Sequence, residues 1–170
     1  DIDLQEREHA IKSREEEMLQ LQELLKEKDD NLSRLKSSVA SALLGFQGEG
    51  LTVEEREGKL YVSLENSLLF PSGSWKVNEK GKKAIVELAK VLVQQPNIQI
   101  MVEGHTDDVP YKGTGLIKDN WDLSVMRATA IVRILANNKG IKVNRITAAG
   151  KGPHSPLVEN NSSENRAVNR

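Results

Sequence analysis

The segment 104–108, with the sequence Gly-His-Thr-Asp-Asp, holds the densest group of side chains that could do chemistry. It follows a run of alternating apolar residues that ends at Glu103, which is typical of a strand passing into a loop. The loop continues to about Asp119, and a helix is expected from around Asn120, where free backbone N–H groups would favour an anion. These residue types predict a polar ligand site beside a helix N-terminus.

Arg127 is the second residue with clear chemical potential. It lies one helical turn after Leu123 and one turn before Ile131, so it shares or flanks the apolar face of its helix. A buried guanidinium needs an acceptor, and a carboxylate is its natural partner. Asp107 is one candidate, and a ligand carboxylate is another. An acid beside an arginine could bind a zwitterion, but the residues alone favour a structural Asp–Arg pair.

The sequence gives little support to metal binding or catalysis. His105, Asp107 and Asp108 could ligate a metal ion, but no second ligand cluster accompanies them and the chain has no Cys. No nucleotide-binding, nucleophile or zinc-protease motif is present. The 24 basic residues against 25 acidic residues argue against a nucleic-acid partner. We therefore expect a binding domain with no catalytic residues, no metal and no cofactor.

Alternating strand and helix patterns must position these residues. Asn78 is expected to cap the first helix of the series, and Glu57-Gly58 to form the turn between the first two strands. The order predicts a two-layer α/β sandwich with its helices on one face of the sheet. Hydrophobic periodicity places strands near 51–53, 60–64, 98–102 and from 146, and helices near 79–95 and 121–138.

Residues 1–44 have a different pattern from the rest of the chain. They contain no Gly and no Pro, and an apolar residue occupies every seventh position. This spacing predicts one long coiled-coil helix, which must cover its apolar seam with a partner. A homodimer is the simplest arrangement, and another homo-oligomer remains open. Residues 45–50 read as a Gly-rich hinge, which leaves 51–170 as the globular domain. The apolar a positions are Leu4, Ile11, Met18, Leu25, Leu32 and Val39.

Several spaced motifs occur together in one order. They are Gly104-His105-Thr106-Asp107, then Asn120-x-x-Leu123-Ser124-x-x-Arg127-Ala128, then Gly150-x-Gly152, Pro156 and Asn165-Arg166-x-x-Asn169-Arg170. The whole, about residues 50–170, resembles the C-terminal peptidoglycan-binding domain of OmpA-like outer-membrane proteins, Pal-type lipoproteins and MotB-type flagellar stators. The resemblance implies an α+β fold of OmpA-like type, with a βαβαβ core and helices on one face of a mixed sheet.

The resemblance also implies a ligand and a set of binding residues. The ligand would be the diaminopimelate of the peptidoglycan stem peptide, whose distal centre is a zwitterion. By motif position, Asp107 would hold its ammonium and Arg127 its carboxylate, with Arg170 as a second cationic contact. The pocket would be lined by Thr106, Asn120 and Leu123. The family pattern continues beyond Asn169-Arg170, so we expect a final strand to be missing from this chain.

A protein of this kind would anchor an envelope protein to the wall in the periplasm of a Gram-negative-type bacterium. A membrane anchor upstream of residue 1 is possible, and its type is open. One alternative is a MotB-type stator subunit with the same wall chemistry, and another is an oligomerisation scaffold that binds no wall. A wall hydrolase is disfavoured, because Asp107 and Asp108 are adjacent and would diverge along an extended chain.

Overall fold

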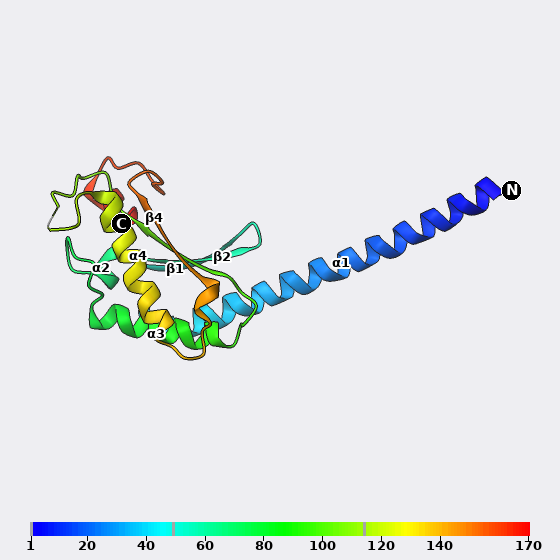
Figure 1. Ribbon diagram of the computed structural model, residues 1–170, viewed down its shortest axis with the longest axis horizontal. Helices are drawn as coiled ribbons and strands as arrows, with labels where there is room; N and C mark the ends of the chain where they lie inside the picture. Colours follow the sequence, from blue (N-terminus) through cyan, green and yellow to red (C-terminus); the bar gives the residue numbers. More distant parts are fainter. Residues whose placement is uncertain (1, 49, 114) are drawn as a thin grey trace.

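Helix α1 (Ile2–Ala42) extends away from the rest of the molecule (Figure 1). The computed structural model describes residues 2–48, 50–113 and 115–170. The helix has 41 residues and is therefore about 60 Å long at 1.5 Å per residue. This confirms the predicted N-terminal helix, while its association with a partner stays a prediction. No helix in the described part of the chain is long and apolar enough to cross a membrane.

The last turns of α1 belong to the core of the domain. Leu35, Val39 and Leu43 are buried, and they form one cluster with Ala84 and Val91. The latter two residues lie on helix α3 (Glu79–Val93), and partly buried residues of the first two strands complete the cluster. A short 3-10 turn, η1 (Leu44–Phe46), then leads toward the first strand. The chain thus packs on one core before and after segment 45–50, and the division there stays a prediction.

Strands β1 (Leu51–Arg56) and β2 (Lys59–Leu64) form an antiparallel hairpin. Its turn is the predicted Glu57-Gly58, with φ angles of 50° and 70°. Two successive positive φ angles make the tight turn whose twist matches that of the flanking strands. Glycine adopts such an angle without strain, which explains its place in this turn.

Strands β3 (Ile100–His105) and β4 (Ile146–Gly152) pair in parallel, with helix α4 (Asn120–Ala136) in the connection between them. The resemblance led us to expect one mixed sheet. Among the described residues, the hydrogen-bonded strands instead form two pairs, β1 with β2 and β3 with β4. The difference has a physical reason, because a period-two pattern specifies which face of a strand is buried but not which strand lies beside it.

Helix α4 packs very closely on the β3–β4 pair, and two glycines permit this. A Cβ atom at Gly104 would lie 2.0 Å from the carbonyl oxygen of Ser124, and one at Gly150 would lie 2.4 Å from Val125 Cγ2. The side chain of Asp119 caps α4 by accepting a hydrogen bond from the Asp122 N–H at 3.0 Å. The close packing fixes the first turns of α4 beside the end of β3, where the polar segment begins.

Helices α3 and α4 share the second core cluster with α2 (Asn66–Leu69). Asn78 caps α3 as predicted, because its Oδ1 accepts a hydrogen bond from Gly81 N–H at 2.7 Å. Two short elements complete the chain, η2 (Val143–Arg145) before β4 and α5 (Ser163–Val168) near its end. The buried members of this cluster are Leu69, Phe70, Ile85, Ala89, Leu92, Ile131, Leu135 and Ile141.

Candidate functional site

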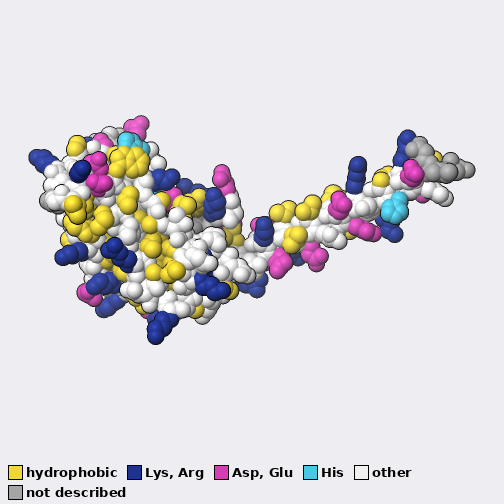
Figure 2. Space-filling model, in the orientation of Figure 1, with side chains coloured by type: hydrophobic (Ala, Val, Ile, Leu, Met, Phe, Trp, Pro, Cys, Tyr) yellow, Lys and Arg dark blue, Asp and Glu magenta, His cyan; other side chains and the backbone are white. Residues whose placement is uncertain are grey.

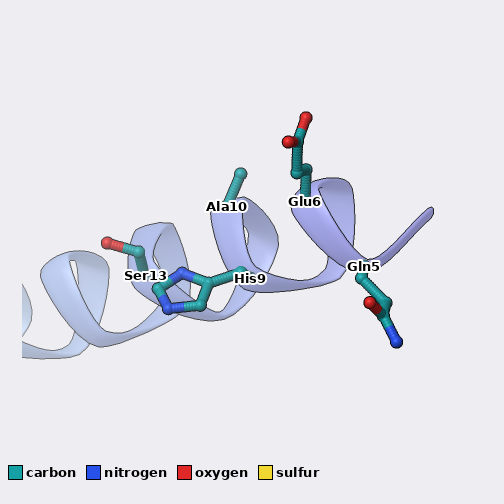
Figure 3. Close-up of a pocket in the computed structure, with 5 residues that line it drawn as sticks. All are labelled: Gln5, Glu6, His9, Ala10 and Ser13. Carbon is teal, nitrogen blue, oxygen red and sulfur yellow. The ribbon is translucent and has the colours of Figure 1, made fainter. Parts of the chain in front are cut away.

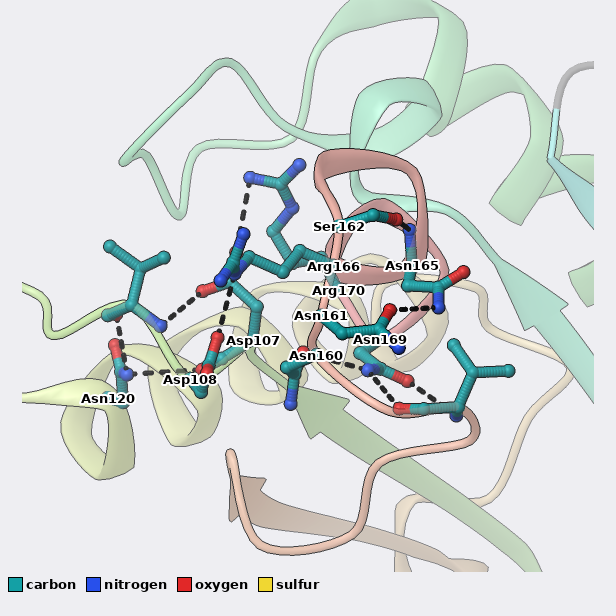
Figure 4. A network of polar contacts seen from close by, with 12 residues as sticks. Asp107, Asp108, Asn120, Asn160, Asn161, Ser162, Asn165, Arg166, Asn169 and Arg170 are labelled. Carbon is teal, nitrogen blue, oxygen red and sulfur yellow. Dashed lines mark hydrogen bonds and ion pairs between the residues drawn. The ribbon is translucent and has the colours of Figure 1, made fainter.

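Asp107 lies just beyond the end of β3 and is buried, with 6% of its surface exposed. Its Oδ1 accepts a hydrogen bond from the Val109 N–H at 3.1 Å. Its Oδ2 lies 3.3 Å from Nη1 of Arg170, so the two side chains form an ion pair (Figure 4). Both oxygens of this carboxylate therefore have partners within the chain.

Arg127 is also buried, with 5% of its surface exposed, and it has far fewer partners. Its Nε donates to the carbonyl oxygen of Ser74 at 3.1 Å, and its guanidinium lies 5.3 Å from the centre of the Phe70 ring. Among the described residues, no acceptor bonds its two terminal nitrogens. These nitrogens are the groups that hold a carboxylate in bidentate geometry.

The sequence suggested an Asp107–Arg127 pair, and the structure corrects this. Among the described residues, the ion-pair partner of Asp107 is Arg170 rather than Arg127. Burial, followed by the positive charge of Arg170, lowers the pKa of Arg127 to about 10, while the negative charge of Asp107 opposes the shift. Arg127 thus remains a cation at neutral pH. Arg127 and Arg170 both lie near the buried acid Asp107, so these three side chains together carry one excess positive charge.

The other predicted site residues surround this group in different ways. Asn120 donates from Nδ2 to the carbonyl oxygens of Asp107 at 3.3 Å and Val109 at 2.9 Å, so it holds the loop in place. Thr106 is buried, and its Oγ1 has no hydrogen-bond partner among the described residues. A buried hydroxyl without a partner is costly, unless a ligand completes it. Leu123 is buried on the first turn of α4.

A second polar network holds the C-terminal segment against the loop (Figure 4). Nε of Arg166 donates to Oδ1 of Asp108 at 2.9 Å. Asn169 accepts from the N–H groups of Leu157 and Val158 at 2.8 and 3.1 Å. The sequence motif contained Arg166 and Asn169 but assigned them no role. Sequence spacing could not show that Arg166 bonds Asp108, because the two residues are 58 positions apart.

One hollow of the described surface adjoins these residues. A hollow of about 240 Å³ is formed by α2, the segment after it and the end of α5, and Phe70 and Arg170 contribute to its wall. An open depression lies far from them on α1, lined by Gln5, Glu6, His9, Ala10 and Ser13 (Figure 3). One helix alone forms it, so it cannot enclose a ligand. The described residues contain no cluster of three or more metal-ligating side chains.

Comparison with curated proteins finds a motility protein and an outer-membrane porin among the relatives. Motility protein B of Bacillus subtilis is 32% identical over 111 residues, which are 65% of this chain and 42% of that protein. Outer membrane porin F of Pseudomonas aeruginosa is 35% identical over 141 residues, which are 83% of this chain and 37% of the porin. The chain thus spans less than half the length of these two relatives.

Solved structures are similar over most of their own length as well as most of this chain. A MotB-like protein from Desulfovibrio vulgaris has a TM-score of 0.77 at 27% identity, covering 86% of this chain and 91% of its own. The cell wall anchor of the T6SS from Pseudomonas aeruginosa has a TM-score of 0.69 at 29% identity, covering 78% and 91%. These likenesses confirm the predicted OmpA-like α/β fold. The model of the OmpA family matches residues 69–170, which include every predicted site residue, and the chain belongs to this family.

Proposed function

We propose that the site around Asp107 and Arg127 binds peptidoglycan through the diaminopimelate of its stem peptide and thereby anchors an envelope protein to the cell wall. The observation that carries this proposal is the buried Arg127, whose terminal nitrogens lack acceptors among the described residues. A buried cation without a carboxylate partner is costly in a domain that binds nothing. A similar structure is itself described as a cell wall anchor.

The geometry supports a specific mode of binding. The ligand carboxylate would bond the terminal nitrogens of Arg127 and add the negative charge that the group lacks. The ligand ammonium would bind Asp107 and compete there with Arg170, which lies 3.3 Å from its Oδ2. A displaced Arg170 could then provide a second contact to the carboxylate. The Oγ1 of Thr106 would gain its missing hydrogen-bond partner.

The direct test is a titration of the 170-residue chain with meso-diaminopimelate, followed by calorimetry or NMR shifts. We expect saturable binding that weakens about tenfold to a hundredfold in Arg127→Met, because a charge-assisted contact is lost. Arg133→Met is the matched control, since Arg133 is an exposed arginine of the same helix. Equal binding by Arg127→Met and the original chain, or no binding by a folded original chain, would refute the proposal.

The same pocket fits a stator subunit, and the similarity to motility protein B favours this as the second candidate. In either role the chain would act in the periplasm as a binding module without catalysis, tethered to a membrane by a segment outside these residues. Replacing the matching region of a motility protein B with this chain would separate the candidates. Restored swimming supports a stator role, while sacculus binding without swimming supports a passive anchor. A chain that binds no sacculi would instead act as an oligomerisation scaffold.

A further inference from the structure

The hollow beside the binding group shares part of its wall with that group. Arg170 lines the hollow, and its Nη1 lies 3.3 Å from Oδ2 of Asp107. Phe70 lines the hollow too, and the centre of its ring lies 5.3 Å from the guanidinium of Arg127. Each of these two side chains thus borders the hollow and also contacts the acid or the cation of the site.

The hollow is small for a complete ligand. Its volume is about 240 Å³. Pockets that hold a whole small ligand have volumes of about 300 to 1,000 Å³. The hollow therefore suits one part of a ligand whose charged end is held elsewhere, and the charged groups next to it are those of the site.

Polar groups make up much of the wall, and several are already fixed in place. Ser67 and Ser72 contribute hydroxyl groups, while Glu65 and Arg170 contribute opposite charges. Oγ of Ser67 donates to Oε2 of Glu65 at 3.4 Å. The backbone N–H of Asn66 donates to the carbonyl oxygen of Arg170 at 3.1 Å, which joins α2 to the C-terminal segment across the hollow.

The charges of the hollow differ from those of the open surface. Figure 2 shows Lys and Arg side chains spread over the face of the domain that it draws, and such a face attracts anions without selecting one. The hollow instead combines one acid, one cation and neutral hydrogen-bonding groups. It therefore selects a ligand by its donors and acceptors. A peptide unit carries one N–H donor and one carbonyl acceptor, so its chemistry matches.

One acceptor among the residues that line the hollow lacks a donor. Oδ1 of Asn66 is closed off from water and has no hydrogen-bond partner among the described residues. A buried carbonyl oxygen without a donor is costly. This is the second such atom near the binding group, after Oγ1 of Thr106. The missing partner of a carbonyl oxygen is an N–H or O–H group.

We infer that the hollow is a second subsite, which takes the peptide unit next to the diaminopimelate and pairs its linking amide N–H with Oδ1 of Asn66. The inference rests on the proposed function, because the distal centre of the ligand must first bind Asp107 and Arg127. The ligand ammonium displaces Arg170 from Asp107, and this movement opens the wall and uncovers Asn66. Asn66 thus selects diaminopimelate that is joined to a peptide.

The test compares two ligands that differ by a single donor. One is a short stem peptide ending in meso-diaminopimelate, and the other has an ester in place of its last amide, so that oxygen replaces the N–H. The original 170-residue chain should bind the ester about tenfold more weakly, because Oδ1 of Asn66 loses its donor. Asn66→Leu should bind the two ligands alike, because its side chain has no acceptor. Calorimetry measures all four affinities.

Two further variants sharpen the test. Asn97→Leu is the matched control, since Asn97 is an exposed asparagine before the amino end of β3, and it should retain the full difference between amide and ester. Ser67→Phe places a large side chain in the hollow from an exposed position. It should weaken the peptide about tenfold and leave the affinity for free meso-diaminopimelate within a few-fold. Asn66→Leu should melt no lower than the original chain, because it removes an unpaired buried acceptor.

The outcomes separate this inference from the proposed function. Equal binding of amide and ester by an original chain whose peptide binding needs Arg127 would overturn the subsite and leave the proposed function intact. A difference between amide and ester that persists in Asn66→Leu, or undiminished peptide binding by Ser67→Phe, would overturn it as well. A folded original chain that binds neither the peptide nor free meso-diaminopimelate would overturn both.

Discussion

Two buried arginines, Arg127 and Arg145, stand near opposite ends of the β3–β4 pair and are each 5% exposed. Arg145 precedes β4 and donates to three backbone carbonyls at and after the end of α3. The acceptors are Leu92 at 2.7 Å, Ile98 at 3.3 Å, and Gln95. Arg127, near the other end, donates to one carbonyl, that of Ser74. Arg145 thus has its acceptors within the fold, while the terminal nitrogens of Arg127 lack acceptors among the described residues.

The comparison shows that burial alone does not identify a functional cation. A saturated arginine at a helix C-terminus compensates the free carbonyls and the dipole there. An unsaturated arginine beside a shared acid is a cost to the domain, unless a ligand offsets it. Arg127, whose terminal nitrogens lack acceptors among the described residues, lies toward the carboxyl ends of the parallel strands. Arg145, with three carbonyl acceptors, lies at their amino ends.

The largest effect that we expect is the loss of stability on replacing Arg145, whose hydrogen bonds hold three backbone carbonyls. Arg145→Met leaves the carbonyls of Leu92, Gln95 and Ile98 without their shared donor, so the free energy of unfolding should fall by about 3 kcal/mol. Urea unfolding followed by circular dichroism measures this. The variant's folded fraction should still bind diaminopimelate as the original chain does. A variant as stable as the original would show that the three hydrogen bonds contribute little.

The next effect concerns the acid of the site. Asp107→Asn keeps the shape of the side chain but removes the charge that would hold the ligand ammonium, so the affinity should fall about tenfold. Calorimetry with meso-diaminopimelate measures the change. A ligand that has the carboxylate but lacks the distal ammonium should bind the original chain and Asp107→Asn alike. A tenfold difference with that second ligand would contradict the assigned role.

Replacing Arg127 should change the stability of the domain less than replacing Arg145 does, and in the opposite direction. Burial lowers the pKa of Arg127 to about 10, so the folded state releases this proton at a lower pH than the unfolded state does. The unfolded state then binds more protons above about pH 10, and the contribution of Arg127 to stability rises with pH there. At neutral pH, Arg127→Met should therefore melt at the same temperature as the original chain or slightly higher.

That excess stability of Arg127→Met over the original chain should shrink as pH rises above about 10. Thermal melts of both proteins at matched pH values give the difference, in which the titration of the other groups cancels. Arg127→Met that melts well below the original chain at neutral pH would show that Arg127 is structural, like Arg145.

The smallest effect concerns the exposed pair beside the site. Asp108 and Arg166 form a 2.9 Å contact, but the side chain of Asp108 is half exposed, so water and salt screen the pair. Asp108→Asn should change the free energy of unfolding by less than about 1 kcal/mol. Its effect on diaminopimelate affinity should remain within a few-fold. A loss as large as that of Asp107→Asn would place Asp108 in the binding group.

The sequence predicted the local structure well, for reasons that lie in nearby residues. Asn78 caps α3 and Glu57-Gly58 turns the hairpin, because both depend on bonds or angles within a few positions. The ion pair between Asp107 and Arg170 could not be predicted in this way, since its members are 63 positions apart. Periodicity likewise placed Leu32 and Val39 on a seam but could not show that their own domain covers it.

The way α1 enters the core has a mechanical consequence. Because Val39 and Leu43 are almost fully buried, the end of the helix is attached rigidly to the domain and cannot rotate independently of it. Deleting one residue between the seam and the core would turn the domain about the helix axis by about 100° and draw it in by about 1.5 Å. The length of α1 therefore sets both the direction in which the site faces and its distance from the start of the helix. A rotation of α1 about its axis would turn the pocket with it.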